Sequence, residues 1–176
     1  MRSTHGSAEM TDGTLLQLRD LTEDFTTAEG RVTAVSADTL AVQHLKARGG
    51  KVGVTGFCMG GALTILSLTM SPEADAGVVW YGFPPLEFVD ASKIRVPVMA
   101  HWAEQDVPFP IATVEQLEEK LRAAGVAYTG HRYLAQHGFA NETAQGPGRI
   151  PITQYDATWA RMAMDRTLAF FGRHLA

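Results

Sequence analysis

Apolar residues along this chain form short, nearly continuous runs, separated by glycine, proline and polar segments. Four runs rich in valine, threonine and aromatic residues have the length and composition of buried strands. The last of the four alternates apolar and polar positions, which is typical of a strand near the edge of a sheet. The predicted strands are 51–57, 76–82, 96–103 and 126–134.

Helical spacing follows most of these strands. In 111–125, Val114, Leu117 and Leu121 recur at intervals of three and four residues and so share one face, and Gly125 ends the pattern. Helices are also predicted over 32–47, 59–70 and 154–175, with Trp159, Met162, Leu168 and Phe171 as the expected core residues of the last.

The order of these elements predicts an α/β fold with a mostly parallel sheet and helices on both faces. We expect 14–176 to form a single domain and the small, polar residues of 1–13 to be mobile. Residues 15–25 are apolar with irregular spacing and predict a short helix or strand. Ligand sites in such sheets lie at the carboxyl ends of the strands.

Composition narrows the classes of function. The net charge is −4 and no basic stripe is present, so we expect no nucleic-acid partner. A single cysteine excludes an intrachain disulfide and a cysteine-rich zinc site, and the six histidines are scattered, so we expect no metal. No apolar run has the length of a membrane span and no signal peptide is recognisable, so we expect a cytoplasmic protein.

Three chemically complementary residues follow three of the predicted strands. Cys58 follows the first, Asp106 the third and His137 the fourth. Because these strand ends meet at one edge of a parallel sheet, we expect a cysteine nucleophile, a histidine base and an orienting aspartate. The order nucleophile, acid, base along the chain is that of α/β-hydrolases.

The segment Gly56-Phe57-Cys58-Met59-Gly60 has the form of a nucleophile elbow with cysteine in place of serine. Small residues two before and two after the cysteine would let the chain turn sharply from strand to helix. The positive end of the following helix would favour a thiolate, and the Met59 N–H would donate to a developing oxyanion.

Each of these residues also has a simpler interpretation. Cys58 would then be a buried core thiol, Asp106 the cap of the next helix, and His137 a surface loop residue. We interpret His101 and His131, which lie within strands, as packing residues.

The chain resembles the dienelactone hydrolase family of α/β-hydrolases. The resemblance runs from about residue 32 to 176 and rests on the segments VGVTGFCMGG, VVWYGFPP, VPVMAHWAEQDVPFP, HRYLAQHGFAN and TLAFFGRHL. It implies a hydrolase of lactones and activated esters that uses a Cys-His-Asp triad, a thioacyl-enzyme and no cofactor. Cys58, Asp106 and His137 match the triad, Met59 the oxyanion donor, and Tyr81 and Phe83 the segment beside the substrate pocket.

Family members place many more residues before the nucleophile than the 57 found here. We therefore expect the chain to lack the first strands of the sheet and the loop that carries the second oxyanion donor. Strand 51–56 would then be an open edge, able to recruit a partner chain such as a second copy, to be covered by 14–30, or to aggregate. A non-catalytic interaction module and an oxidation-sensing thiol at Cys58 stay open as alternatives to the hydrolase.

Overall fold

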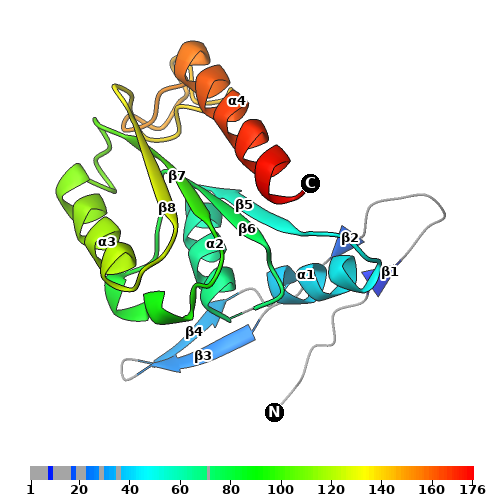
Figure 1. Cartoon of the computed structure of the whole chain (residues 1–176). Coiled ribbons are helices and arrows are strands. Elements are labelled where there is room, and N and C mark those ends of the chain that lie inside the picture. Colours follow the sequence, from blue (N-terminus) through cyan, green and yellow to red (C-terminus); the bar gives the residue numbers. More distant parts are fainter. Residues whose placement is uncertain (1–7, 10–16, 19–22, 28–29, 35–36, 71) are drawn as a thin grey trace.

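The computed structural model describes residues 8–9, 17–18, 23–27, 30–34, 37–70 and 72–176. At its centre is a four-stranded sheet with the order β5-β6-β7-β8 (Figure 1), in which all neighbours run parallel. The strands are β5 (Gly53–Phe57), β6 (Ala76–Trp80), β7 (Val98–Ala103) and β8 (Tyr128–Tyr133). All four predicted strands are confirmed, each slightly shorter than predicted.

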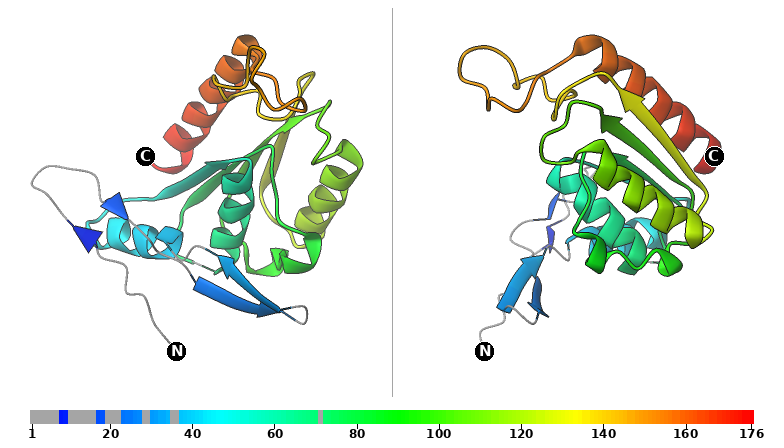
Figure 2. Two further views of the ribbon diagram at one scale, coloured as in Figure 1. Left: turned by 180° about the vertical axis from the view of Figure 1, so that it is seen from behind. Right: turned by 90° about the vertical axis from the view of Figure 1, so that its left-hand side faces the viewer.

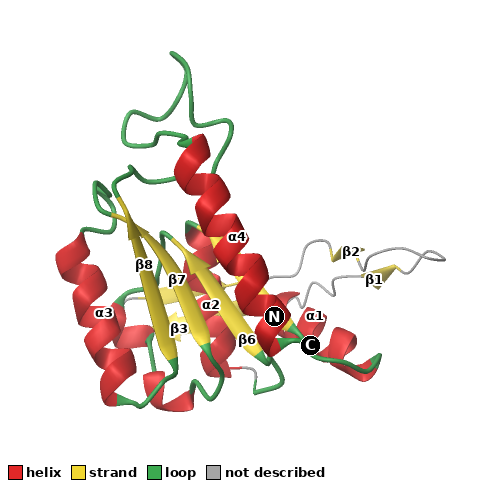
Figure 3. Ribbon diagram, turned by 45° about the horizontal axis from the view of Figure 1, so that its top comes forward, coloured by secondary structure: helices red, strands yellow, loops and turns green. Residues whose placement is uncertain are grey.

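Helices cover both faces of this sheet, as the pattern predicted. One face carries three helices, and the other carries the C-terminal helix α4 (Figures 1 and 3). The helices are α1 (Ala37–Ala47), α2 (Met59–Met70), α3 (Ile111–Ala123) and α4 (Ala157–His174), and two 3₁₀ turns, Leu86–Phe88 and Ala91–Lys93, connect β6 to β7.

Side chains of the central strand β7 divide between the two layers. Val98, Ala100 and Trp102 pack in the core shared with α2 and α3, whereas Met99 and Ala103 pack in the core under α4. The alternation follows from the two-residue period of a strand. Because both faces are covered, all six residues of β7 are buried, which explains why its sequence is apolar except for His101.

The buried face of α4 differs from the predicted one. Ala163, Thr167 and Phe170 are its buried residues, whereas Met162 and Leu168 are 38% and 63% exposed. Small residues let the helix approach the sheet closely, and the Thr167 hydroxyl lies 2.9 Å from Nε2 of the fully buried His101. Of the other expected core residues, Trp159 and Phe171 are half-buried.

One further prediction, the start of the first helix at residue 32, is wrong. Residues 30–34 form β4 (Gly30–Ala34), paired antiparallel with β3 (Glu23–Thr27), so the first helix begins at Ala37 and not at residue 32. Val32 and Thr33 are β-branched and favour a strand. This hairpin lies at the opposite end of the molecule from α4 (Figure 2).

A second short pair, β1 (Ala8–Glu9) with β2 (Gln17–Leu18), is also antiparallel. The rest of 1–13, whose mobility was expected, and most of 15–22 lie outside the described residues. Within the described part of the chain, β5 pairs only with β6, and neither hairpin joins it. The open edge expected at this strand is therefore present among the described strands.

Candidate active site

Cys58 lies between β5 and α2 in a left-handed backbone conformation, with φ of 55°. Its N–H donates to the Trp80 carbonyl at 2.9 Å, and its own carbonyl accepts from the N–H of Gly61 at 2.9 Å. A non-glycine residue in this conformation is strained, and such strain is characteristic of the nucleophile position of an elbow. The thiol is exposed, so Cys58 is not the buried core cysteine of the simpler interpretation.

Three glycines make this sharp turn possible. A Cβ at Gly56 would lie 2.2 Å from the Gly60 carbonyl oxygen, and one at Gly82 would lie 2.0 Å from the Cys58 carbonyl oxygen. A Cβ at Gly61 would lie 2.7 Å from the Gly82 carbonyl oxygen, whereas one at Gly60 would meet nothing within 4 Å. The small residue is thus required two positions before the cysteine, but not two after it.

The three residues from the strand ends meet at the carboxyl edge of the sheet. His137 Nε2 lies 3.1 Å from Cys58 Sγ, and His137 Nδ1 lies 2.8 Å from Asp106 Oδ2. The Asp106 and His137 side chains are only 1% and 8% exposed, whereas the thiol reaches solvent. The chain can therefore move a proton between the thiol and the imidazole, and the buried carboxylate can hold the ring in place.

Asp106 uses its two carboxylate oxygens in different ways. While Oδ2 faces His137, Oδ1 accepts a hydrogen bond from the Phe109 N–H at 2.9 Å. Helix α3 begins only at Ile111, and the side chain of its cap residue Pro110 accepts no hydrogen bond from the first N–H groups of the helix. Asp106 therefore stabilises its own turn rather than the helix, which replaces the helix-cap interpretation.

His137 is held by the loop between β8 and α4, which projects beyond the carboxyl end of the sheet (Figure 3). Gly138 follows it with φ of 70°, and the His137 carbonyl accepts from the Gln154 N–H at 3.1 Å. The Phe109 ring is stacked on the imidazole at 5.8 Å between centroids, and the Tyr81 ring is edge-on at 5.3 Å. Two aromatic rings thus hold the imidazole between them.

The remaining predicted site residues occupy different places. Tyr81 is buried and also has a positive φ, of 35°; burial, and then the neighbouring Cys58, raise the pKa of its phenol well above the usual range. Met59 is the first residue of α2, so its N–H is among those without an acceptor inside the helix. Phe83 packs in the core against Trp102 and Phe109 and does not line the pocket beside the cysteine.

That pocket has a volume of about 500 Å³. Cys58, Tyr81 and His137 line it together with Phe57, Gly138, Ala140, Asn141, Ile150 and Thr153. Phe57, Ile150 and Thr153 were not among the predicted site residues: Phe57 ends β5, and Ile150 and Thr153 lie in the loop after β8, where no periodic signal marks them. Among the described residues, no three His, Cys, Asp or Glu side chains come together as metal ligands, and no helix is long and apolar enough to cross a membrane.

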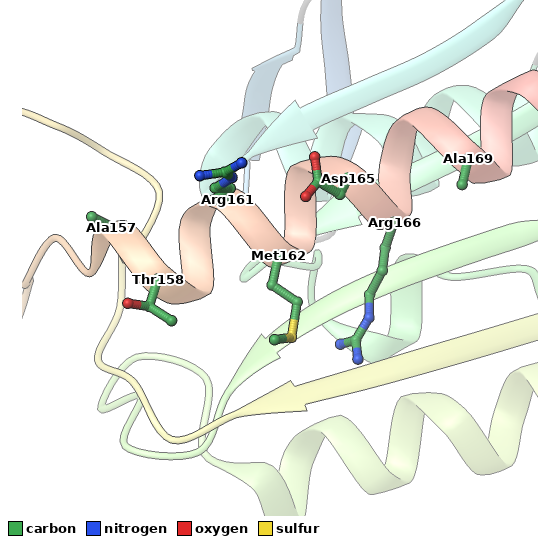
Figure 4. Close-up of a pocket in the computed structure, with 7 residues that line it drawn as sticks. All are labelled: Ala157, Thr158, Arg161, Met162, Asp165, Arg166 and Ala169. Atoms are coloured by element: carbon green, nitrogen blue, oxygen red, sulfur yellow. The ribbon is translucent and has the colours of Figure 1, made fainter.

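A larger depression, of about 750 Å³, runs along α4 (Figure 4). All of its lining residues come from this one helix, including Arg161, Met162, Asp165 and Arg166. Met162 and Arg166 point toward β8, whereas Arg161 and Asp165 point away from it (Figure 4). A surface formed by one helix cannot enclose a ligand, and none of the three strand-end residues lines it, so the pocket beside Cys58 is the candidate active site.

A parallel sheet with helices on both faces and a strained residue on a strand-to-helix turn defines the class as α/β-hydrolase-like. The chain belongs to the dienelactone hydrolase family, whose model matches residues 17–175. It is 35% identical over 127 residues to protein usf of Aquifex pyrophilus, covering 71% of this chain and 52% of that protein. The carboxymethylenebutenolidase homolog of Xenopus tropicalis is 39% identical over 72 residues, covering 41% of this chain and 29% of the relative.

Solved structures support the same relationship. The dienelactone hydrolase-like promiscuous phosphotriesterase P91, from metagenomic libraries, superposes with a TM-score of 0.71 at 25% identity. The alignment covers 79% of this chain and 60% of that structure. The aligned segments thus cover between 29% and 60% of the length of these relatives.

Proposed function

We propose that this chain is a hydrolase of carboxylic esters or lactones that acts through Cys58, His137 and Asp106. The observation that supports it is the continuous contact from thiol to imidazole to carboxylate, at 3.1 and 2.8 Å, beside a pocket at the carboxyl edge of the sheet. Membership of the dienelactone hydrolase family supports the same class of reaction.

The proposed reaction has two halves. Cys58 Sγ attacks the ester carbonyl carbon while its proton passes to His137 Nε2, and the bond from carbon to the leaving oxygen then breaks as the imidazolium returns that proton to the alkoxide. In the second half, water gives a proton to His137 and attacks the thioacyl carbon. The C–S bond breaks, the acid leaves, and the proton returns to sulfur.

Asp106 and Met59 would assist in different ways. Asp106 accepts from Nδ1–H, which leaves Nε2 free to take the thiol proton, and its negative charge stabilises the imidazolium. The Met59 N–H, at the positive end of α2, would donate to the oxyanion. Tyr81 lines the same pocket and would contact the substrate as a neutral phenol, because the pKa of its hydroxyl is raised.

Turnover of p-nitrophenyl acetate tests this proposal. We expect slow release of p-nitrophenol by the unaltered chain, and loss of that activity in Cys58→Ala. Circular dichroism of the variant confirms that it folds, which is expected because the thiol is exposed. A Cys58→Ala variant that kept the original rate would refute the proposal.

A second candidate function is favoured by the open edge of β5. Its outward hydrogen-bonding groups are unpaired among the described strands, and Thr55 and Phe57 are exposed. Such an edge can pair with a strand of another chain, so we also propose that a second copy associates there. A folded chain that sediments as a monomer at high concentration, with rapid amide exchange along β5, would contradict this association.

A further inference from the structure

The pocket beside Cys58 has no lysine or arginine among its lining residues. We propose that it selects esters whose acyl group is uncharged and apolar, and that it discriminates against acyl groups that carry a carboxylate. This inference rests on the proposed ester hydrolysis and deepens it by naming the class of substrate.

The lining is mostly apolar. Phe57, Tyr81, Ala140 and Ile150 contribute carbon surface, and the other polar contributions outside the strand-end residues are neutral. Asn141 is one of these: its side-chain oxygen accepts from both the N–H and the hydroxyl of Thr143, at 3.0 and 2.8 Å. Its amide group can therefore offer only a neutral donor to a ligand.

The neighbouring charges would not neutralise a bound carboxylate. Arg149 adjoins the pocket in sequence, but its guanidinium donates to the carbonyls of Ile150 and Pro151 in its own loop. The imidazole of His137 already faces the buried carboxylate of Asp106. An acyl carboxylate would thus lose its hydration without gaining a cationic partner and would lie near an existing negative charge, which is costly.

Exposed apolar side chains gather around the same opening. Phe57 is 42% exposed and Ile150 is 65% exposed, and both line the pocket. Met59 and Ile152, adjacent in sequence to lining positions, are 72% and 39% exposed. Apolar surface gathered at a pocket rather than scattered singly is typical of a binding surface, and here it would contact an apolar acyl chain.

Two esters of matched shape test whether the pocket prefers an apolar acyl group to one that carries a carboxylate. In p-nitrophenyl hemisuccinate the acyl chain ends in a carboxylate, and in p-nitrophenyl 4-methylpentanoate an isopropyl group stands in its place. We expect kcat/KM to be higher for the neutral ester by about tenfold or more, after subtraction of the rate with Cys58→Ala. Within a series of straight-chain neutral esters, kcat/KM should rise by up to about fourfold for each methylene that the pocket buries.

A charge introduced at the pocket gives a matched control. Ile150→Lys should lower the preference for the neutral ester by about threefold to tenfold, because it places an ammonium group at the opening. Leu168→Lys adds the same charge on α4, at a residue that is 63% exposed against 65% for Ile150, and should leave the preference unchanged.

The outcomes distinguish this inference from the proposed function. If hemisuccinate is hydrolysed as fast as its neutral match in a reaction that needs Cys58, ester hydrolysis stands and the inference is overturned. If p-nitrophenyl acetate is hydrolysed in a reaction that needs Cys58 but neither of these esters is, only the inference is overturned. If p-nitrophenyl acetate is not hydrolysed either, the proposed function fails and the inference fails with it. The comparison of substrates by the unaltered chain decides between these results even if Ile150→Lys does not fold.

Discussion

Gly56 is the position at which the smallest change should do most damage to the site. In Gly56→Ala the new methyl group would lie 2.2 Å from the Gly60 carbonyl oxygen, 2.4 Å from its carbonyl carbon and 2.8 Å from its Cα. All three atoms belong to the backbone of the first turn of α2, so no side-chain rotation can relieve the contact. Either β5 or the start of the helix has to move.

The size of the effect follows from that displacement. Ordinary contact begins at about 3.4 Å, so the turn has to open by roughly 1 Å, and overpacking of this kind costs about 1–3 kcal/mol of unfolding free energy. Cys58 lies within the turn and its Sγ is 3.1 Å from His137 Nε2. A misplacement of about 1 Å at a reacting group can cost about 100-fold in rate.

Urea unfolding followed by circular dichroism measures the first effect, and turnover of p-nitrophenyl acetate the second. Gly60→Ala is the matched control, because its methyl group would meet nothing within 4 Å and the position is helical. That variant should keep its activity and gain about 0.4–1 kcal/mol. A Gly56→Ala variant as stable and as active as the unaltered chain would refute the account of the elbow.

Three further predictions concern the buried polar groups. Burial, with His131 and Arg166 nearby, lowers the pKa of His101 to about 3 from 6.5. Between pH 6.5 and about 3 the unfolded chain therefore binds a proton that the folded chain does not, so stability should decrease as the pH is lowered, by up to about 1.4 kcal/mol per unit. Urea unfolding at several pH values should show a shallower decrease in His101→Gln. Thr167→Val should cost about 1–3 kcal/mol of unfolding free energy, because it leaves the buried His101 Nε2 unpaired. The control Thr158→Val changes an exposed position and should cost little. Equal losses in the two variants would contradict this prediction. Asp106→Asn should fold and lose about 10³-fold or more in kcat/KM for p-nitrophenyl acetate, and an unchanged rate would exclude a role for this carboxylate.

The central sheet could be predicted from the sequence because β6 and β7 are buried along their whole length and read as mostly apolar runs, and β8 shows the alternation of a strand near the sheet edge. The buried face of α4 could not be predicted in this way. Met162 and Leu168 are as apolar as a core residue, and only the tertiary structure, which requires Ala163 and Thr167 for close approach to the sheet, turns them outward. β4 was assigned to the following helix, although its pairing with β3 is local, from Thr27 with Gly30 to Glu23 with Ala34, and its β-branched residues favour a strand.

The candidate site was predictable in part for a related reason. Cys58, Asp106 and His137 each follow a strand, and the topology of a parallel sheet brings strand ends together. The pocket itself depends on the conformation of the loop after β8, which no periodicity encodes. Phe109 is an intermediate case. Its N–H donates to the Asp106 carboxylate three residues earlier, which forms a local turn, whereas the stacking of its ring on His137 depends on the tertiary structure.

The most direct test of the central claim is mass spectrometry of the chain during turnover of p-nitrophenyl acetate. If Cys58 is the nucleophile, acid quenching should trap one acetyl group per chain, on the peptide that contains Cys58, in a form that hydroxylamine removes. Because the chain has a single cysteine, no other thiol can carry the group. Turnover that proceeds without acetylation of Cys58, or with the acetyl group on another residue, would contradict the account.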